Sequence, residues 1–539
     1  MSLSISPQPE RSDGRPDQPD QPSQPTSEGE DRSKTLMGRA VRGGAILMAA
    51  RLLVQVFVWS VTLVVAHLLT PYDYGILATV AIFVGLSDLL AEAGLARALV
   101  QKESLTQADI NGAFTISLIL AALLYVPIYF VAEPAGLFWN MPELPLVLKL
   151  LGALVLLVPV RCIAAALLDR ELRLGQQAAV NVSCSVVQSG VVLLLAWLGF
   201  AYWALTLGVI VGRLLEAAAL LRAANWLPRI VRPTYEQFRL IQFGLHVSLS
   251  DLLTFAYTKT DVAVIARFCG ASATGAYSLA FQLISLPVQK LTINTNQAVY
   301  PLLCRLQNDP IRRRDWYLRL TVLLGVFGMP ALIGMALVAP DALPLLLGSK
   351  WVEAVLPFQL LSVVGVLMVY SASLPPLFTA LGRPDINLRY TAVCSVLFPL
   401  GFLLGSWRNG VVGVCIVWLT LYPLLFAAQL SLTQRLTGIR LIDFVYAQRI
   451  VVTAAVLMTA GVLAIRHLLD AQSLWLRLPT AIIGGAVIYA GVLLSLGRQS
   501  VLKDLRAIWR TLRNKAGSAD GNATLTEPRV SGQQMAIAP

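Results

Sequence analysis

Charged residues are scarce in this chain. Only 13% of its 539 residues are Asp, Glu, Lys or Arg, while 56% are apolar, against roughly 25% and 45–50% in a typical soluble domain. This shortage of charge excludes an ordinary soluble enzyme. The apolar runs begin near Gly43 and recur until about Leu496. A membrane crossing needs about 20 apolar residues, so this stretch has room for about fourteen helices joined by short turns.

Histidine and paired cysteine are also lacking. The three histidines (His67, His246 and His467) are far apart in sequence and form no metal or triad pattern. The six cysteines lie in or at the ends of apolar segments, without the paired spacing of disulfide or zinc sites: Cys162, Cys184, Cys269, Cys304, Cys394 and Cys415. No G-x-x-x-x-G-K-[ST] loop is present, and no loop is long enough for a nucleotide-binding domain. We therefore expect no metal, no cofactor and no direct use of ATP.

The two ends of the chain have little to bury. Residues 1–34 are rich in Pro, Gln, Ser and acidic residues, which predicts a disordered cytoplasmic tail. A secretory signal would need an apolar stretch behind a basic start, and these residues have none. Residues 498–539 are expected to form a second cytoplasmic tail.

Basic residues alternate along the apolar part of the chain. The predicted spans are 43–69, 75–97, 110–132, 147–168, 177–199, 201–222, 240–266, 275–303, 318–339, 355–381, 388–406, 410–432, 447–468 and 477–497. About 27 Lys and Arg fall at the even-to-odd turns and flanks, against about 5 at the odd-to-even turns. The positive-inside rule then places both termini in the cytoplasm. The net charge of +12 is thereby a topology signal, and we expect no nucleic-acid partner.

An internal repeat is visible at a shift of 200 residues. The segment from Arg51 aligns without a gap with the segment from Asp251, and Gly75 coincides with Gly275 in the turn after a helix. Six spans separate the copies, so both have the same orientation, which is typical of a parallel repeat. The predicted fold is an all-α polytopic membrane protein with two six-helix lobes, 35–222 and 240–434. A basic cytoplasmic linker, 223–239, joins them, and two further helices occupy 435–497.

Ionisable and amide side chains inside the spans are the candidate functional residues, because each charge costs roughly 2.5–3.5 kcal/mol at a helix centre. Asp88 and Glu92 are four residues apart and share one helix face. The others are Arg51 in the first span, Asp251, Lys259 and Asp261 in the seventh, and Gln289, Lys290, Asn294, Asn296 and Gln297 in the eighth. We interpret this set as lining a hydrated space between the lobes.

A plainer interpretation exists for several of these residues. Lys259, Asp261 and Arg267 lie toward the outer end of their span, where long side chains reach the headgroups. Lys259 and Asp261 are two residues apart, so we expect them to point to nearly opposite sides and not to line one cavity together. Arg97 and Arg161 are alternatively topology anchors.

Several strings resemble a known family. They are LTPYDYGILATVAIFVGLSDLLAEAGLARALVQKESLTQADINGAF, LLDRELRL, TDVAVIARFCGASATGAYSLAFQL, YPLLCRLQNDP, LLLGSKWVEAVLPFQLLS and LFTALGRPDINLR. Their order and spacing, over roughly residues 35 to 500, resemble the polysaccharide-transporter branch of the MOP superfamily, the Wzx-type flippases. The resemblance implies fourteen helices, alternating access and no enzymatic activity. It also implies transfer of a polyprenyl-diphosphate-linked repeat unit across the bacterial inner membrane, with membrane lipids and polysaccharide polymerase or export proteins as partners.

Residue roles follow from this resemblance. Arg51 and Lys290 suit the diphosphate, and Asn294, Asn296 and Gln297 suit sugar hydroxyls; Lys259 and Arg267 are further substrate-binding candidates. The carboxylates Asp88, Glu92, Asp251 and Asp261 are candidates for a coupling site for protons or sodium. No motif selects among them.

Two alternative functions stay open. A MOP-type exporter of small cationic drugs should have an acidic cavity, whereas the intramembrane charges here have both signs. A membrane-embedded polysaccharide polymerase would ordinarily need a large periplasmic loop, and the longest outer loops here have only about fifteen residues.

Overall fold

A computed structural model describes residues 54–497, except for 93, 95–97, 101, 103 and 234; the side chains of 174, 235–248, 250, 293–299 and 301 are not described either. The chain divides into two compact units, Met1–Phe57 and Val58–Pro539. The described residues of the first unit are only 54–57, so the account below concerns the second unit. The predicted tails, 1–34 and 498–539, lie outside the described residues.

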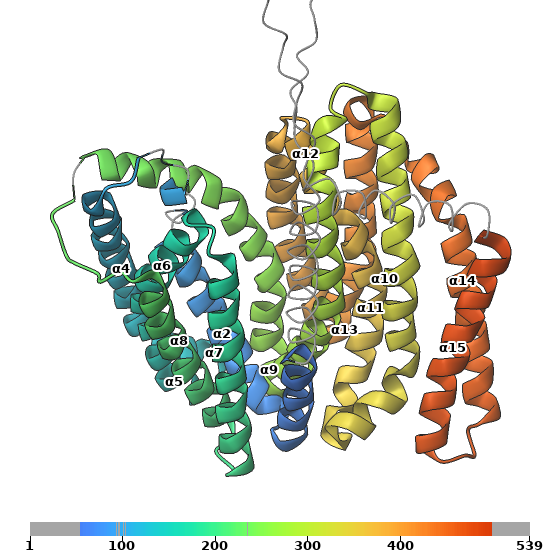
Figure 1. Cartoon of the computed structure of the whole chain (residues 1–539). Helices are drawn as coiled ribbons and strands as arrows, with labels where there is room; N and C mark the ends of the chain where they lie inside the picture. Colours follow the sequence, from blue (N-terminus) through green and yellow to red (C-terminus); the bar gives the residue numbers. More distant parts are fainter. Residues whose placement is uncertain are drawn as a thin grey trace, which may run out of the picture. The chain divides into compact units, whose positions relative to one another are not determined.

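The described residues form helices and no β-strand (Figure 1). After the helix Val54–Leu68, the order is α2 (Pro71–Glu92), α4 (Gln107–Trp139), α5 (Leu144–Ala153), η1 (Leu154–Leu157), α6 (Val158–Arg170), α7 (Leu174–Trp197), α8 (Tyr202–Ala224), α9 (Tyr235–Arg305), α10 (Pro310–Leu347), η2 (Ser349–Ala354), α11 (Val355–Ser371), α12 (Leu374–Ala380), α13 (Pro384–Thr437), α14 (Leu441–Leu468) and α15 (Leu474–Gly497). Helix α9 begins inside the predicted linker 223–239.

Eleven segments of the described chain are long and apolar enough to cross a membrane. Two of them, α9 and α13, are interrupted by non-helical backbone, at Gly270 and at Asn409–Gly410. Each is therefore a pair of helices, which makes thirteen crossing segments, and the shorter apolar helix Val54–Leu68 precedes them. The protein is an all-α, multi-pass membrane protein, and each of the fourteen predicted spans overlaps one of these segments.

Both interrupted helices fold back on themselves. Tyr277 and Asp261 are 16 residues apart in α9, yet the Tyr277 hydroxyl donates a 2.6 Å hydrogen bond to the Asp261 carboxylate. A straight helix would separate them by about 24 Å. In α13, a Cβ atom placed on Gly405 would lie 2.6 Å from the carbonyl oxygen of Gly413. The glycines at the turns have positive φ angles, 82° at Gly270 and 57° at Gly410, which glycine adopts without steric cost.

A reciprocal backbone contact joins α2 to the second half of α9. A Cβ atom on Gly75 would lie 1.9 Å from the carbonyl oxygen of Ala271, and one on Gly275 would lie 1.7 Å from that of Pro71. The shift of 200 residues maps Gly75 onto Gly275 and Pro71 onto Ala271. The two contacts therefore exchange under the repeat, as a pseudo-two-fold axis between parallel copies requires.

The last two helices, α14 and α15, pack on α10 (Figure 1). Asp341 of α10 has only 5% of its surface exposed. It pairs with Arg466 of α14 at 3.0 Å and with Arg477 of α15. Because a buried carboxylate is costly unless it is paired, this three-residue cluster fixes the position of α14 and α15 against α10.

Candidate functional site

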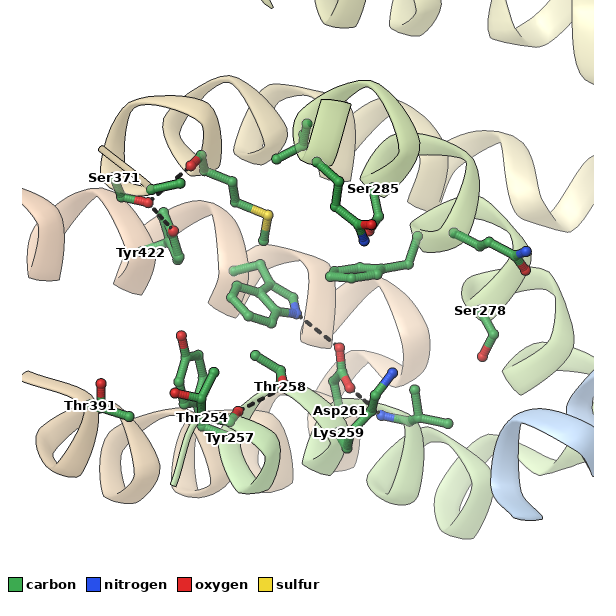
Figure 2. Close-up of a pocket in the computed structure, with 18 of the residues that line it drawn as sticks. Thr254, Tyr257, Thr258, Lys259, Asp261, Ser278, Ser285, Ser371, Thr391 and Tyr422 are labelled. Atoms are coloured by element: carbon green, nitrogen blue, oxygen red, sulfur yellow. Dashed lines mark hydrogen bonds between the residues drawn. The ribbon is translucent and has the colours of Figure 1, made fainter. Parts of the chain in front are cut away.

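A cavity of about 790 Å³ lies among α9, α11, α12 and α13, with α2 along one side (Figure 2). Most of its lining is aromatic, hydroxyl or amide. The lining residues are Ala78, Ala81, Thr254, Tyr257, Thr258, Lys259, Asp261, Val262, Ser278, Phe281, Gln282, Ser285, Leu286, Val288, Gln289, Met368, Ser371, Ala372, Pro375, Asn387, Tyr390, Thr391, Trp418, Tyr422 and Gln429. Lys259 and Asp261 are the charged members of this set.

The two halves of α9 supply much of the lining. On the second half, Ser278, Gln282, Ser285 and Gln289 recur at intervals of three or four residues and share one helix face. On the first half, Thr254, Tyr257, Thr258 and Asp261 do the same. The turn at Gly270 sets the two polar faces opposite each other, and Figure 2 shows Ser278 and Ser285 across from the first-half residues.

Asp261 lies in the cavity wall with 1% of its surface exposed. The Tyr277 hydroxyl donates to Oδ2 at 2.6 Å, the Trp418 indole donates to the same oxygen at 3.3 Å, and the Val262 amide donates to Oδ1 at 2.6 Å. Trp418 also donates to the Tyr277 oxygen at 3.0 Å. These donors are all neutral, so they hold a carboxylate in place without neutralising its charge.

Aromatic rings form a continuous wall beside Asp261. Phe398 lies at the centre: its ring centroid is 5.5 Å from that of Tyr257, in a stacked pair, and 4.6 Å from that of Trp418. Trp418 is in turn 5.8 Å from Tyr422, whose hydroxyl bonds Ser371 (Figure 2). Phe398 and Trp418 are buried and support the wall, whereas the half-buried lining rings of Tyr257, Phe281 and Tyr390 offer apolar faces to a ligand. With the hydroxyl and amide groups of the lining, they can hold a ligand that is polar at its edges and apolar on its faces.

The prediction that Lys259 and Asp261 would not line one cavity is wrong. Both line it, and Figure 2 shows them side by side. Residues two apart on a helix do start on nearly opposite sides. The flexible four-carbon stem of lysine, however, carries its ammonium group around the helix. The interpretation that the side chain reaches the headgroups is also wrong for Asp261, because this carboxylate is buried.

Several predicted site residues lie away from this cavity. Lys290 is exposed and is not among the lining residues, although the neighbouring Gln289 is. Arg267 is exposed, with its guanidinium 4.9 Å from the centre of the Phe138 ring. Asp251 is half-buried near the start of the first predicted span of α9. Arg51, and the side chains of Asn294, Asn296 and Gln297, lie outside the described residues.

Asp88 belongs to a separate cluster of charges between α2, α6 and α8. It pairs with Arg213 at 2.8 Å. Beside it, Arg161 makes two bonds to Glu216, at 2.8 and 3.0 Å. The two cations and two carboxylates balance one another. Glu92, predicted to share a face with Asp88, is exposed at the last residue of α2.

The sequence reasoning missed the aromatic residues of the lining and its amides other than Gln289. Trp418, Tyr422 and Gln429 lie in an apolar span, where aromatic residues look like ordinary core. A signal was present on the second half of α9, where Ser278, Gln282, Ser285 and Gln289 follow the helical repeat. Trp418, Tyr422 and Gln429 of α13 also follow the helical repeat, but in an apolar span this spacing does not distinguish a cavity face from the core.

One end of the bundle is closed by contacts between segments far apart in the chain. The helix Val54–Leu68 ends there, and Lys350 Nζ donates to the carbonyl oxygens of His67, at 2.6 Å, and Leu68, at 3.2 Å. The Trp351 indole donates to the carbonyl oxygen of Ala66 at 2.8 Å. These donors satisfy carbonyl groups that a helix end leaves without partners. The glycine contacts between α2 and α9 lie near the same end, since Tyr74 packs edge-on against Trp351 at 5.3 Å.

The sequence profile of a family described as "Polysaccharide biosynthesis protein" matches residues 64–356, more than half of the chain. The chain belongs to this family. It is therefore a polysaccharide biosynthesis family protein by sequence, and the predicted resemblance to Wzx-type members of the MOP superfamily is confirmed.

Relatives of this protein are named for the biosynthesis or transport of polysaccharides. The lipopolysaccharide biosynthesis protein WzxC of Escherichia coli is 24% identical over 369 residues, which cover 66% of this chain and 73% of WzxC. The succinoglycan biosynthesis transport protein ExoT of Rhizobium meliloti is 24% identical, covering 66% of this chain and 72% of ExoT. The teichuronic acid biosynthesis protein TuaB of Bacillus subtilis is 22% identical, covering 78% and 88%.

Two solved structures share the fold of this protein. The lipid II flippase MurJ, in an inward closed conformation, superposes with a TM-score of 0.69 at 13% identity, covering 83% of this chain and 98% of MurJ. An inward-facing multidrug resistance MATE family transporter of the MOP superfamily gives a TM-score of 0.52 at 15% identity, covering 73% and 94%. The fold is thus the all-α fold of these MOP-superfamily structures, as predicted.

Proposed function

We propose that this protein moves a polyprenyl-diphosphate-linked oligosaccharide repeat unit from the cytoplasmic to the periplasmic leaflet of a bacterial inner membrane. The translocated repeat unit then serves the assembly of exopolysaccharide, O-antigen or capsule. Family membership, the names of the relatives and the fold shared with a lipid II flippase support this function. Polysaccharide polymerase or export proteins are the proposed partners.

The lining of the main cavity is the observation that carries the proposal. A sugar cannot enter hydrocarbon unaided, because its hydroxyl groups would lose water without gaining hydrogen bonds. The cavity replaces water with hydroxyl and amide groups, and it offers the half-buried rings of Tyr257, Phe281 and Tyr390 to the apolar faces of the sugar. Its volume of about 790 Å³ falls in the usual range of ligand pockets, about 300–1,000 Å³.

The diphosphate needs cations at the same time. Lys259 is the cation of the described cavity lining and is the first candidate. Lys290 follows the lining residue Gln289, and we propose that it meets the diphosphate outside the sugar cavity. Arg51 and Arg267 are further candidates. Asn294, Asn296 and Gln297 continue the polar second half of α9 and are proposed to bind hydroxyls.

Ion coupling is proposed to act through Asp261. Of the four candidate carboxylates, Asp261 lines the cavity, whereas Asp88 already has Arg213 as its partner. A buried carboxylate held by neutral donors can take up a proton or a sodium ion without breaking an ion pair. Glu92 and Asp251 are the less favoured alternatives.

Transport is proposed to proceed by alternating access of two lobes, 35–222 and 240–434, with 435–497 attached to the second lobe. The structure has Lys350 and Trp351 bonded to the end of the helix Val54–Leu68. Alternating access requires these contacts to open when the site faces the other side. Both termini are proposed to lie in the cytoplasm.

Deletion of the gene tests the function directly. The proposal expects lipid-linked oligosaccharide to accumulate on the inner leaflet while export of the polymer stops, and the intact gene should reverse both effects. A small-cation exporter, the competing function, would leave the oligosaccharide pool unchanged and raise sensitivity to cationic drugs. That result would reject the flippase proposal.

A further inference from the structure

A second cavity, of about 860 Å³, lies at the arginine-rich end of the first half of the chain. It is formed by the start of α4 and the ends of α6 and α8. Its lining residues are Leu105, Gln107, Ile110, Asn111, Leu167, Arg170, Glu171, Arg173, Ala224, Asn225, Trp226, Leu227 and Arg229. It shares no lining residue with the main cavity. The proposed transport function therefore does not use it.

The charge of this cavity is positive. Its lining has three arginines and one carboxylate, and that carboxylate, Glu171, is bonded by Arg173 at 2.9 Å. Arg229 is exposed at the cavity, and no hydrogen bond or ion pair of its side chain is found among the described residues. An anionic group entering the cavity therefore meets guanidinium groups and no unpaired carboxylate.

The walls are fixed before any ligand binds. Arg170 of the lining donates to the carbonyl oxygens of Leu99, at 2.9 Å, and Lys102. The Trp226 indole, buried to 6% exposure, donates to Asn111 at 3.4 Å and packs edge-on against Phe114 at 5.6 Å. A preorganised wall lowers the conformational-entropy cost of binding, because its side chains are already ordered.

The helix ends at the cavity are also satisfied internally. Backbone N–H groups of residues 172 and 173 bond the carbonyls of Asp169 and Leu168, and those of 225 and 226 bond the carbonyls of Arg222 and Leu221. Both α6 and α8 thus end in a Schellman motif. The motifs thereby engage the carbonyl groups of Leu168, Asp169, Leu221 and Arg222 and fix the ends of both helices at the cavity.

The rim of the cavity, defined as the lining residue Leu227 with Leu172 and Ile230, which adjoin lining residues in the chain, is aliphatic and exposed. Leu172, Leu227 and Ile230 have 81%, 77% and 74% of their surfaces exposed. Leu172 also has a left-handed backbone, with φ at 56°, at the position of the Schellman motif that glycine usually occupies. Large aliphatic side chains beside arginines, at the ends of membrane-crossing helices, suit the boundary between headgroups and acyl chains.

We propose that this cavity binds the phosphate headgroup of an anionic phospholipid from the leaflet at the arginine-rich end. Arg229 holds the phosphate together with the remaining N–H groups of Arg173, whose guanidinium also bonds Glu171 and Gln176, and the acyl chains lie against Leu172, Leu227 and Ile230. Basic pockets between membrane helices bind anionic headgroups in this way. A soluble phosphate would use the same arginines but would leave the aliphatic rim in water.

The test uses the full-length protein, purified in detergent, and native mass spectrometry to count bound phosphatidylglycerol. The variant is R173Q/R229Q. The matched control is R312Q/R389Q, which removes two arginines that are 77% and 78% exposed in the second half of the chain. We expect the first variant to lose phosphatidylglycerol affinity by about tenfold or more, as for lost hydrogen bonds to a charged group. The control should bind like the wild type.

Two further arms distinguish the ligand source and guard against misfolding. The single variant R229Q removes a side chain with no bonding partner among the described residues, so it should fold normally and still weaken binding. Phosphatidylcholine and inorganic phosphate should bind much more weakly than phosphatidylglycerol. Equal binding by R173Q/R229Q and the control, equal binding of phosphatidylcholine, or equal competition by inorganic phosphate would each overturn the proposal.

Discussion

At the scale of single residues, Asp261 is the most informative side chain. It is a fully buried carboxylate whose partners are the Tyr277 hydroxyl, the Trp418 indole and the Val262 amide. Burial of a charge is costly without such partners. A residue that is so expensive to bury, and that lines the main cavity, is the natural place for the coupling step of the proposed transport cycle.

Replacing Asp261 by Asn separates its charge from its shape. Asn keeps hydrogen-bonding capacity at the site but cannot bind a proton or a cation as a carboxylate does. We expect D261N protein to reach the membrane at near-normal abundance and polymer export to fall to background. The measurement is export normalised to protein in the membrane fraction. Normal export by D261N would show that coupling occurs elsewhere.

Removing the hydroxyl of Tyr277 should affect stability instead. In Y277F the buried carboxylate loses its shortest side-chain donor, at 2.6 Å, and the expected cost is about 1–3 kcal/mol. The midpoint of thermal unfolding in detergent measures this effect. Y446F is the matched control, because Tyr446 is 62% exposed and should unfold like the wild type. Equal midpoints for the two variants would contradict the role given to the Tyr277–Asp261 bond.

Lys259 and Lys290 distinguish the two proposed cation positions. Lys259 lines the cavity and Lys290 does not. If the diphosphate meets Lys259, K259Q should abolish export at unchanged abundance, and K259R should retain part of it because the charge is kept. K290Q is measured in parallel. Export by K259Q at the wild-type level, with loss in K290Q, would move the diphosphate site to Lys290.

At the scale of helices, the contact between α2 and α9 sets the closed end. Gly275 leaves no room for a side chain, because a Cβ atom would lie 1.7 Å from the Pro71 carbonyl oxygen. A Cβ atom placed on Gly334 in α10 would meet no other atom within 4 Å. These two glycines therefore form a matched pair for the same substitution.

We expect G275A to separate α2 from α9. Both polymer export and the fraction of molecules in which this end of the bundle is closed should fall. Closure is measured by the yield of a disulfide between cysteines placed at Asp73 and Ala273, in a background without the six native cysteines. G334A should export normally and be slightly stabilised, by about 0.5–1 kcal/mol, since alanine favours the helix.

The crosslink between cysteines at positions 73 and 273, once formed in the closed protein, should itself stop transport. Full export with the crosslink in place would argue against rocking of the lobes.

At the scale of the whole molecule, the two-lobe proposal depends on the topological frame. Labelling of single cysteines should place the turns around Asn140, Lys350 and Gln472 in the periplasm, and those around Lys102, Pro228 and Arg313 in the cytoplasm. The expectation follows from the alternation of basic residues. A single turn on the wrong side would break the frame and, with it, the parallel orientation of the repeat.

The sequence by itself determined the fold class, the spans and the repeat. These depend on local properties: the length of apolar runs, the side on which Lys and Arg gather, and the match of Gly75 with Gly275. The first two follow from the cost of placing charge or unpaired backbone groups in hydrocarbon, and the third follows from comparing the two halves of the chain. Polar residues on the second half of α9 could likewise be read from their helical spacing.

Only the tertiary structure decided which residues form the site. Trp418 reaches Asp261 because α9 and α13 both fold back at a glycine and then pack together. Asp88 and Asp261 look alike in sequence, yet one meets Arg213 and the other meets neutral donors. Side-chain surroundings depend on contacts between residues more than a hundred positions apart, and apolar helices carry no local pattern that specifies such contacts.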